Sequence, residues 1–301
     1  MVLTGSRKMA LGQHNVGLLD ECRRRARMRS GGEDLTEGGV ANDVDGEGLG
    51  LERELAETAG GSPIESAGPA ARTRRLAPLR DKTPGQVRLH EVYRSIQGEG
   101  TWAGLPCVFV RLTACHLRCV YCDTPHAFVF REGGDFTIEA IVARVAELAE
   151  PGGLVEVTGG EPLLQPEALP LMTALADAGF EVLLETSGSL DIAPVDRRVH
   201  IIMDLKTPGS GEEAANLWTN LDHLKPTDNL KFVVTNRADF DWTLEIVRRH
   251  DLTARCPVLV SPAFDAVSPR DLAEWILKSR LPLRMQLQLH KLIWHPKARG
   301  V

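Results

Sequence analysis

The chain has 301 residues, of which 43% are hydrophobic, and a formal net charge of -6 at pH 7. This length allows one or two domains of ordinary size, and the negative charge argues against nonspecific nucleic-acid binding by the folded part. No apolar run approaches the roughly 20 residues of a membrane span, and the first residues lack the long apolar segment of a signal peptide. We therefore expect a soluble, cytoplasmic protein that binds neither membrane nor nucleic acid.

Residues 1–86 differ in composition from the rest of the chain. No Phe, Trp or Tyr precedes Tyr93, and half of the 28 glycines lie before residue 86. Residues 30–71 are rich in Gly, Glu, Asp, Ala and Pro without an apolar period, so they cannot bury enough surface to offset the entropy lost on ordering. The basic run Arg23–Arg29 could contact nucleic acid, but a solvated tail is the simpler interpretation. We expect a disordered extension over residues 1–86 and one domain over residues 87–301.

From Leu89 onward, short apolar runs alternate with helical patterns, which is typical of parallel βα units. Strands are expected at residues 108–112, 154–157, 181–184, 200–205, 230–234, 258–260 and 285–289. Helices are expected at residues 137–150, 167–178, 239–249 and 269–278. About six βα units are too few for a closed eight-stranded barrel. The prediction is an α/β fold, a partial and open TIM-like barrel with its active site at the C-terminal ends of the strands.

Three cysteines with C-x3-C-x2-C spacing, Cys115, Cys119 and Cys122, follow the first expected strand. Thiolates at this spacing can bind three irons of a 4Fe-4S cluster and leave the fourth iron without a protein ligand. An electron-transfer cluster or a structural zinc site would instead need four protein ligands. The alternatives are zinc with His116 or His126 as the fourth ligand, or three incidental thiols.

The other three cysteines carry no comparable pattern. Cys107 and Cys256 lie in apolar runs and are expected to be buried thiols, and Cys22 lies in the N-terminal extension. In a reducing compartment, six cysteines of this kind indicate metal ligands and core residues rather than disulfides.

Polar motifs follow nearly every expected strand. They are Thr158–Pro162, Glu185–Gly188, Asp204–Lys206 and Ser261–Pro262. Adjacent glycines in the first motif allow a backbone to approach a ligand closely. Each motif also has a simpler interpretation: a turn for the Gly-Gly and Ser-Pro pairs, a rim carboxylate for Glu185, and a solvated ion pair for Asp204 with Lys206.

The cysteine spacing resembles the signature of the radical S-adenosylmethionine (SAM) superfamily. In that superfamily the open iron binds the amino and carboxylate groups of SAM, and the reduced cluster splits SAM to give a 5'-deoxyadenosyl radical. The motif Thr158–Pro162 resembles the Gly-Gly-Glu loop that binds the methionine amino group there. Its position at the end of the strand that follows the cysteine loop strengthens this resemblance.

Three further stretches resemble the 7-carboxy-7-deazaguanine synthase family of the queuosine (7-deazapurine) pathway. They are Glu91–Gly100, the pair Asp123 and Thr124 directly after the last cysteine, and Gln286–Pro296. The resemblance covers residues 89–296. It implies a carbon-nitrogen lyase that contracts the ring of 6-carboxy-5,6,7,8-tetrahydropterin to 7-carboxy-7-deazaguanine with loss of ammonia. It also implies three cofactors: a 4Fe-4S cluster, SAM, which is regenerated, and Mg2+.

The same resemblance assigns the site residues, and it assigns no catalytic residue beyond the cluster and the SAM radical. Cys115, Cys119 and Cys122 would bind the cluster, and Thr124 would bind Mg2+, although a lone Thr could simply end a turn. SAM would contact Tyr121, Asp123, Gly160, Ser187, Asp204, Lys206 and Ser261. The substrate would contact Ile96, Gln97, Gly98, Arg111, Thr158, Glu185, His290 and Pro296, with His290 a core histidine as the alternative. A guanidinium at Arg111 suits a carboxylate, and a carboxylate at Glu185 suits the paired N–H groups of a pterin edge.

The resemblance further implies a flavodoxin-like or other low-potential reductant and a homodimer. Two departures from the family pattern are visible: residues 297–301 follow Pro296, where relatives tend to end with a carboxylate that reaches the substrate, and Thr207 stands where many relatives have Cys. Two other functions are kept open. One is a different radical SAM enzyme, such as an activase that installs a glycyl radical on a protein, and the other is a zinc-binding interaction module.

Overall fold

The computed structural model describes residues 74–129, 133–296 and 298–301. The expectations for residues 1–73, including Cys22 and the basic run Arg23–Arg29, lie outside these residues. The strands are β1 Val87–Ile96, β2 Pro106–Leu112, β3 Gly134–Phe136, β4 Leu154–Gly159, β5 Glu181–Thr186, β6 His200–Asp204, β7 Asn229–Val234, β8 Val258–Pro262 and β9 Arg284–Met285. The α-helices are α4 Ile138–Leu148, α5 Ala168–Asp177, α6 Arg237–Arg249, α7 Leu252–Arg255, α8 Pro269–Ser279 and α9 Leu289–Ile293.

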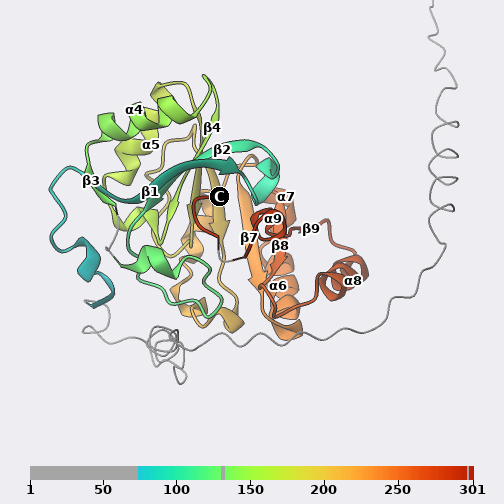
Figure 1. Cartoon of the computed structure of the whole chain (residues 1–301). Coiled ribbons are helices and arrows are strands. Elements are labelled where there is room, and N and C mark those ends of the chain that lie inside the picture. The colour runs from blue at the N-terminus through green and yellow to red at the C-terminus, as the bar shows by residue number, and fades with distance from the viewer. Residues whose placement is uncertain (1–73, 130–132, 297) are drawn as a thin grey trace, which may run out of the picture. The chain divides into compact units, whose positions relative to one another are not determined.

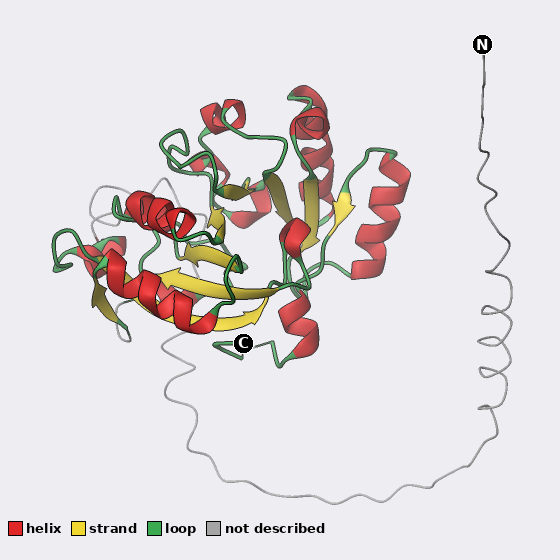
Figure 2. Ribbon diagram, turned by 90° about the horizontal axis from the view of Figure 1, so that it is seen from above, coloured by secondary structure: helices red, strands yellow, loops and turns green. Residues whose placement is uncertain are grey.

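The strands form one curved sheet in the order β3-β1-β2-β4-β5-β6-β7-β8-β9. β1 runs antiparallel to β2 and to β3, whereas β2 and β4 to β9 run parallel to one another. Since β3 and β9 are the two edges of the sheet, the barrel stays open (Figures 1 and 2). The expected partial, open barrel of parallel strands is confirmed.

The four helices expected from the sequence are present, and three of them begin at a capping side chain. Thr137, Asn236 and Ser268 each accept a hydrogen bond from a backbone N–H in the first turn of α4, α6 and α8. Such caps satisfy backbone donors that a helix leaves unpaired, and Pro269 at the first position of α8 fits the same boundary. Local sequence therefore sets where these helices start.

Alternation along the strands separates a helix-covered face from a pocket face. Val155 and Val157 of β4 belong to the main core, which also includes buried side chains of α4, α5 and α6. The residues between them point the opposite way. On that concave face a small apolar cluster forms the floor of the barrel, consisting of Cys107, Phe109, Leu154, Leu183 and Ile202. The expectation that Cys107 and Cys256 are buried thiols is confirmed.

Sequence analysis missed β1 and misjudged the last strand. β1 contains an irregularity in its pairing between Leu89 and Glu91, which breaks the alternation that would identify a strand. The expected strand at 285–289 is wrong beyond Met285, because β9 ends there and α9 begins at Leu289. The chain leaves the sheet at this point, and the Leu289 N–H donates to the Gly98 carbonyl at 3.2 Å.

Two connections also differ from full βα units. Between β5 and β6 there is no α-helix, and between β6 and β7 there are only short 3-10 helices, of which the first is Pro208–Ser210. These connections carry residues that build the pocket, and Asn216 is an example, since its side chain binds the backbone N–H and the carbonyl of Lys206.

Residues 74–86, which precede the expected domain boundary, contact the folded domain. Arg75 donates to the His116 carbonyl at 2.7 Å, and Lys82 pairs with Glu167 of the α5 region at 2.7 Å. Arg88 of β1 donates to the Pro78 carbonyl at 2.7 Å. These contacts attach residues 74–86 to the domain. No described helix is long and apolar enough to cross a membrane.

Candidate active site

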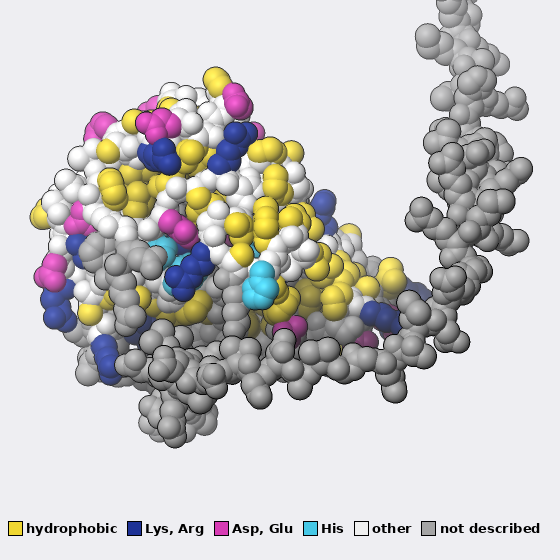
Figure 3. Space-filling model, viewed as in Figure 1, with side chains coloured by type: hydrophobic (Ala, Val, Ile, Leu, Met, Phe, Trp, Pro, Cys, Tyr) yellow, Lys and Arg dark blue, Asp and Glu magenta, His cyan; other side chains and the backbone are white. Residues whose placement is uncertain are grey.

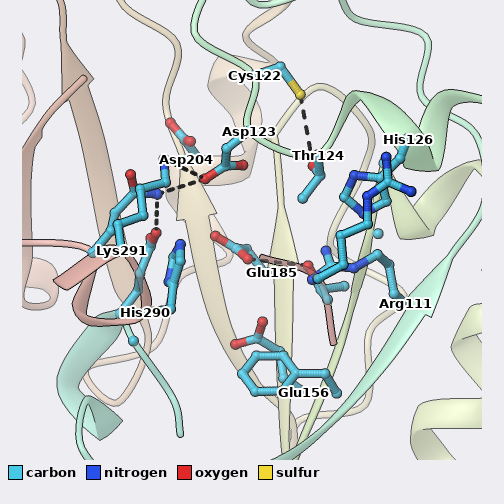
Figure 4. A pocket seen from close by; sticks show the side chains of 18 of the residues that line it. Arg111, Cys122, Asp123, Thr124, His126, Glu156, Glu185, Asp204, His290 and Lys291 are labelled. Carbon is cyan, nitrogen blue, oxygen red and sulfur yellow. Dashed lines mark hydrogen bonds and ion pairs between the residues drawn. The ribbon is translucent and has the colours of Figure 1, made fainter. Parts of the chain in front are cut away.

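A pocket lies at the C-terminal ends of the parallel strands (Figure 4). The residues assigned to the cluster, Mg2+, SAM and substrate line this one pocket, with Ser261 as the exception. Ser261 is 2% exposed within β8, and Ala263 and Phe264, a few residues further along, line the pocket instead. Ser261 pairs in register with Val233 of β7, which lines the pocket, so its side chain lies on the pocket side of the sheet although it is buried.

The cysteine loop is held against the end of β4 by backbone hydrogen bonds. Ala114 directly precedes Cys115 and has a φ of 82°, an unusual conformation for a residue with a Cβ. Its N–H donates to the Ala127 carbonyl at 2.8 Å, and its carbonyl accepts from the Glu161 N–H at 2.8 Å. Such strain persists where surrounding contacts enforce it, and it is found at functional sites.

The three thiols fit a cluster held by three ligands better than a closed zinc site. All of them line the pocket, and burial raises the pKa of Cys115 to about 12 and that of Cys119 to about 11. Binding of a metal would therefore displace protons from these thiols. The His116 Nε2 lies 3.0 Å from the Ser189 hydroxyl, and the His126 Nε2 lies 3.9 Å from Glu91, so neither histidine is poised as a fourth ligand.

The Gly-Gly loop packs directly on the cysteine loop. A Cβ placed on Gly160 would lie 2.2 Å from the Ala114 carbonyl oxygen and 2.8 Å from the Cys115 Cβ, so only glycine fits. The buried Glu161 then joins this loop to the end of β5. Its carboxylate accepts from the Ser187 N–H at 2.7 Å and from the Thr186 hydroxyl at 2.9 Å.

Asp204 and Lys206 at the end of β6 form a buried pair, with 2.8 Å between the Lys206 Nζ and the Asp204 Oδ2. The Lys206 Nζ also lies 5.7 Å from the centre of the Tyr121 ring. Among the described residues, the buried Asp204 Oδ1 and Tyr121 hydroxyl have no hydrogen-bond partner. Buried polar atoms are normally satisfied, so these two atoms indicate that a polar ligand binds here.

Lys231 of β7 is the central cation of the pocket, although no motif pointed to it. Its Nζ lies 2.6 Å from Glu99, 2.6 Å from Glu185 and 3.8 Å from Asp204. Burial alone would lower the pKa of Lys231, but these carboxylates outweigh burial and raise it. Burial alone would raise the pKa of Glu185, but Lys231 outweighs it and lowers the pKa below its usual value. Glu185 is therefore an ionised acceptor, which also receives the Thr158 hydroxyl at 3.2 Å.

Arg111 at the end of β2 is held on the opposite wall. Its Nε donates to Glu91 at 2.9 Å, and its Nη2 donates to the Tyr93 hydroxyl at 2.8 Å. His90, Glu91 and His126 also form a group whose possible ligand atoms lie within 4.8 Å of one another. Because Arg111 already binds the Glu91 oxygen that a metal would need, we interpret this group as a support for the guanidinium.

The C-terminal segment completes the mouth of the pocket. Lys291 of α9 lies 3.1 Å from Asp123, and the Gln288 side chain donates to Asp123 at 2.9 Å and to Glu99 at 2.8 Å. Burial would raise the pKa of Asp123, but these partners outweigh it and lower the pKa to about 2. Thr124 lies beside this pair, with its hydroxyl 3.8 Å from the Cys122 sulfur. His290 is brought to the pocket by the contact between its neighbour Leu289 and Gly98.

Comparisons with known proteins first identify the class of enzyme to which the chain belongs. The sequence model of the Radical SAM superfamily matches residues 110–250. The crystal structure of QueE from Escherichia coli superposes with a TM-score of 0.53 and 23% identity, over 67% of this chain and 94% of that one, and thus shares the fold. The chain is a radical SAM enzyme.

Relatives with higher sequence identity then identify the family within this class. The chain is 46% identical to the 7-carboxy-7-deazaguanine synthase of Koribacter versatilis over 71% of this chain and 100% of that protein. It is 45% identical to the enzyme of the same name from Chlorobaculum tepidum, over 73% and 99%. The chain belongs to the 7-carboxy-7-deazaguanine synthase family. This result favours the synthase over the glycyl-radical activase and the zinc-binding module.

The pocket also contains ionisable residues that were not predicted from the sequence. These side chains, which line or support the pocket, are Glu99, Glu156, Glu161, Lys231 and Lys291. Glu156 and Lys231 lie inside expected apolar strands, where a single ionisable residue is a signal that could have been used. Ionisable residues are rarely buried without a partner, so each one implies a polar concave face.

Proposed function

We propose that the chain converts 6-carboxy-5,6,7,8-tetrahydropterin into 7-carboxy-7-deazaguanine by a radical SAM ring contraction that releases ammonia. The observation that carries this proposal is one pocket with three thiols on one wall and the groups for a pterin, Glu185 and Arg111, on two others. Membership of the synthase family supports the same reaction.

The chain's own residues would bind the substrate by its two polar ends. A pterin presents a flat edge of amide and amine N–H groups, which an ionised Glu185 can accept as two parallel hydrogen bonds. The carboxylate of the substrate would pair with Arg111, whose planar guanidinium matches it. Both groups are oriented in advance, Glu185 by Lys231 and Thr158, and Arg111 by Glu91 and Tyr93, so little reorganisation is needed on binding. Ile96, Gln97, Gly98, His290 and Pro296 would form the remaining contacts.

Cys115, Cys119 and Cys122 would hold the 4Fe-4S cluster. When bound, the cluster and SAM supply the 5'-deoxyadenosyl radical that removes a hydrogen atom from the substrate. The Gly160 backbone, Ser187, Tyr121, Asp123, Asp204 and Lys206 would hold SAM beside the cluster. The two unpartnered atoms, Asp204 Oδ1 and the Tyr121 hydroxyl, support this assignment. Ser261, buried at the end of β8, would contact SAM from the neighbouring strand.

Mg2+ would bind at Thr124. The hydroxyl of Thr124 would be one oxygen ligand, with substrate oxygens and waters completing the octahedron that Mg2+ prefers. Its role would be to stabilise negative charge during the rearrangement. In support, Thr124 lies between the cysteine loop and the substrate wall, and the neighbouring Asp123 is already paired with Lys291.

We also infer a cytoplasmic homodimer that receives electrons from a flavodoxin-like or other low-potential protein. A cluster bound by three free thiols suits a reducing compartment. Exposed apolar side chains on β9, α9 and the adjacent loop support self-association, namely Phe264, Met285, Leu292 and Ile293. Figure 3 shows hydrophobic side chains gathered on this side of the molecule.

The direct test is mass spectrometry of the product. The protein would be reconstituted anaerobically with iron and sulfide and incubated with SAM, Mg2+, reductant and carboxytetrahydropterin. We expect 7-carboxy-7-deazaguanine, with ammonia released and no net consumption of SAM. Cys119→Ala should produce neither the product nor 5'-deoxyadenosine. Bound zinc without a cluster signal in the EPR spectrum, or a different product, would refute the proposed function.

A further inference from the structure

Glu156 is an ionisable side chain in an apolar setting. It lies on the concave face of β4, two residues before Thr158, and is 2% exposed. Its register partners are Phe109 of β2 and Leu183 of β5, both members of the apolar cluster that forms the barrel floor. Figure 4 shows Glu156 below Glu185, toward the bottom of the pocket. An ionised carboxylate in such a position is costly unless it is paired.

No described cation pairs with Glu156. Lys231, the nearest candidate, binds Glu99 and Glu185. The hydrogen bond found for Glu156 comes from the side-chain amide of Gln97. The amide group of Gln97 therefore donates to Glu156, while its carbonyl oxygen accepts from the Glu99 N–H at 3.1 Å.

Burial, and after it the negative charge of Glu185, raises the pKa of Glu156 well above its usual value. The hydrogen bond from Gln97 acts in the opposite direction but is weaker, as is the charge of Lys231. The ionisable groups that face Glu156 are Tyr93, Glu99, Cys107, Glu185 and Lys231. Burial raises the pKa of both Tyr93 and Cys107, so these two stay neutral near pH 7. Burial and the charge of Glu185 thus both favour the neutral form of Glu156, since an anion would add to the charges of Glu99 and Glu185.

The turn that Glu156 supports contacts both ends of the domain. The Gln97 N–H and carbonyl bind the backbone of Leu105 and Gly104 at 2.8 Å each, and the Gly98 carbonyl accepts from the Leu289 N–H. A Cβ on Gly98 would lie 2.7 Å from the His290 Nδ1. Gln97, Gly98 and His290 thus share one wall of the pocket, and the orientation of the Gln97 amide depends on the acid beneath it.

We propose that Glu156 is a positioning residue of the substrate site, which acts as a neutral acid to orient the Gln97 amide and the turn that carries it. The inference rests on the proposed function, because it assigns the Gln97 wall to the pterin. The hydrogen bond described for Glu156 goes to Gln97 and not to the cysteine or Gly-Gly loops, so we assign its role to the substrate and not to SAM.

Two substitutions of Glu156 test whether it acts as a neutral acid, as a charged carboxylate, or only by occupying space in the core. Glu156→Gln keeps the shape, one acceptor and a donor, whereas Glu156→Leu keeps the volume but cannot accept from Gln97. We expect KM for the pterin to rise about tenfold in Glu156→Leu, the effect of one lost oriented hydrogen bond. In Glu156→Gln it should stay within about threefold of the wild type, and SAM affinity should be unchanged in both. Glu147→Gln on the exposed face of α4 is the matched surface control.

A double mutant tests whether Glu156 acts through Gln97. In a Gln97→Ala background, Glu156→Leu should raise KM no further, because the partner that it orients is already absent. A further tenfold rise would overturn the positioning role, and so would wild-type KM in the Glu156→Leu single mutant. Glu156→Gln as defective as Glu156→Leu would overturn the neutral form.

The protonation state has its own readout, which does not need the loaded enzyme. A folded-state pKa raised above the unfolded value makes the wild type lose stability as pH rises from the unfolded pKa toward the folded one. Glu156→Gln cannot ionise and does not suffer this loss. The Tm of the variant minus the Tm of the wild type should therefore increase as pH rises from about 5 to about 8. Infrared spectra should show a protonated carboxyl band in the wild type that is absent in Glu156→Gln. An equal Tm difference at all pH values, with no such band, would refute the neutral acid, whereas failed pterin turnover by the wild type would refute the proposed function alone.

Discussion

At the scale of single residues, charge balance decides how the pocket works. Three carboxylates, Glu99, Glu185 and Asp204, lie within 4 Å of the ammonium group of Lys231. A buried ion pair contributes little net stability by itself, but removing one partner leaves an uncompensated charge and is costly. Lys231 therefore fixes which carboxylates are ionised, and so which ones can accept hydrogen bonds from a substrate.

Replacement of Lys231 should weaken pterin binding more than SAM binding. In Lys231→Met the effect of burial on Glu185 is opposed only by the weaker charge of Arg111, so the pKa of Glu185 should rise and the neutral form should lose an acceptor. We expect KM for the pterin to rise by at least about tenfold near pH 7, the loss of one charge-assisted hydrogen bond, with partial recovery as pH rises and Glu185 ionises. Lys231→Arg should retain more affinity, and exposed Lys278→Met on α8 is the control. Steady-state kinetics from pH 6 to 9 would check this, and a KM that falls with decreasing pH would contradict it.

The hydroxyl of Thr124 should control the response to Mg2+. Thr124→Ala is expected to raise the Mg2+ concentration for half-maximal activity by about tenfold or more, because even changes outside the ligand shell cost about 10- to 100-fold in metal affinity. Thr124→Ser keeps the hydroxyl and is the matched control. Cleavage of SAM without substrate should survive in both variants. Initial rates against Mg2+ concentration would decide, and an unchanged titration in Thr124→Ala would remove this residue from the proposed metal site.

The candidate site residues that could be predicted from the sequence are those that form motifs directly after strands. The cysteine loop and the Gly-Gly loop each follow a strand in the chain. In a parallel barrel such loops meet at one end, so their proximity can be predicted without knowing how side chains pack. Lys231 and Glu156, as single ionisable residues inside apolar runs, indicate a polar face, but without a motif spacing they cannot be assigned to a particular ligand. Which face each occupies depends on the strand register, which only the structure supplies.

At the scale of elements, the contact between the Gly-Gly loop and the cysteine loop is so close that it leaves no room for a side chain at Gly160. Gly160→Ala would place a Cβ 2.2 Å from the Ala114 carbonyl oxygen, and backbone cannot move aside as a flexible side chain can. We expect the variant to fold, with a circular dichroism spectrum like the wild type, but to retain less than about half of the iron after reconstitution, since cluster binding requires its thiolate ligands in place.

A second glycine separates steric contact from backbone strain. Gly152 has a φ of 72° and no atoms within 4 Å of a built Cβ. Gly152→Ala should therefore lose about 1 kcal/mol of stability through its left-handed conformation but bind iron normally. If Gly160→Ala also reconstituted fully, the two loops would be less constrained than their contact indicates.

The elements that sequence patterns identified are those with an unbroken period. α4, α5, α6 and α8 have apolar faces and, in three cases, capping residues, and they lie close to the expected positions. β1 was missed because its irregular pairing near Leu89 interrupts the alternation. Residues 286–289 were expected to continue the last strand, but their course is set by contacts with the distant turn around Gly98 and Glu99 rather than by local propensity.

At the scale of the whole molecule, the open barrel leaves an apolar edge. Met285 of β9 and Leu292 and Ile293 of α9 are exposed by 36%, 66% and 54%. They lie on the side where Figure 1 labels β9 and α9 together. Solvent-exposed apolar side chains that gather in one place commonly mark an interface, and an exposed edge strand is a further surface to cover.

We expect this edge to form the proposed dimer interface. Leu292→Asp should shift the protein from dimer to monomer, because a charge in an apolar interface is costly to bury. Sedimentation velocity at several concentrations would measure the change, with exposed Leu277→Asp on α8 as the control that keeps the dimer. A monomeric wild type, or an unchanged dimer in Leu292→Asp, would exclude this edge.

The contact of Gly98 and Glu99 with residues 286–291 has a consequence for biosynthesis. When the first seven strands have left the ribosome, every proposed ligand of the cluster has been made. The wall beside Gln97 still lacks Gln286, Gln288 and His290. Substrate binding should thus be acquired last, after the nascent chain has already formed most of its sheet. A messenger truncated before codon 286 would yield a polypeptide able to incorporate iron and sulfide but with little affinity for a pterin.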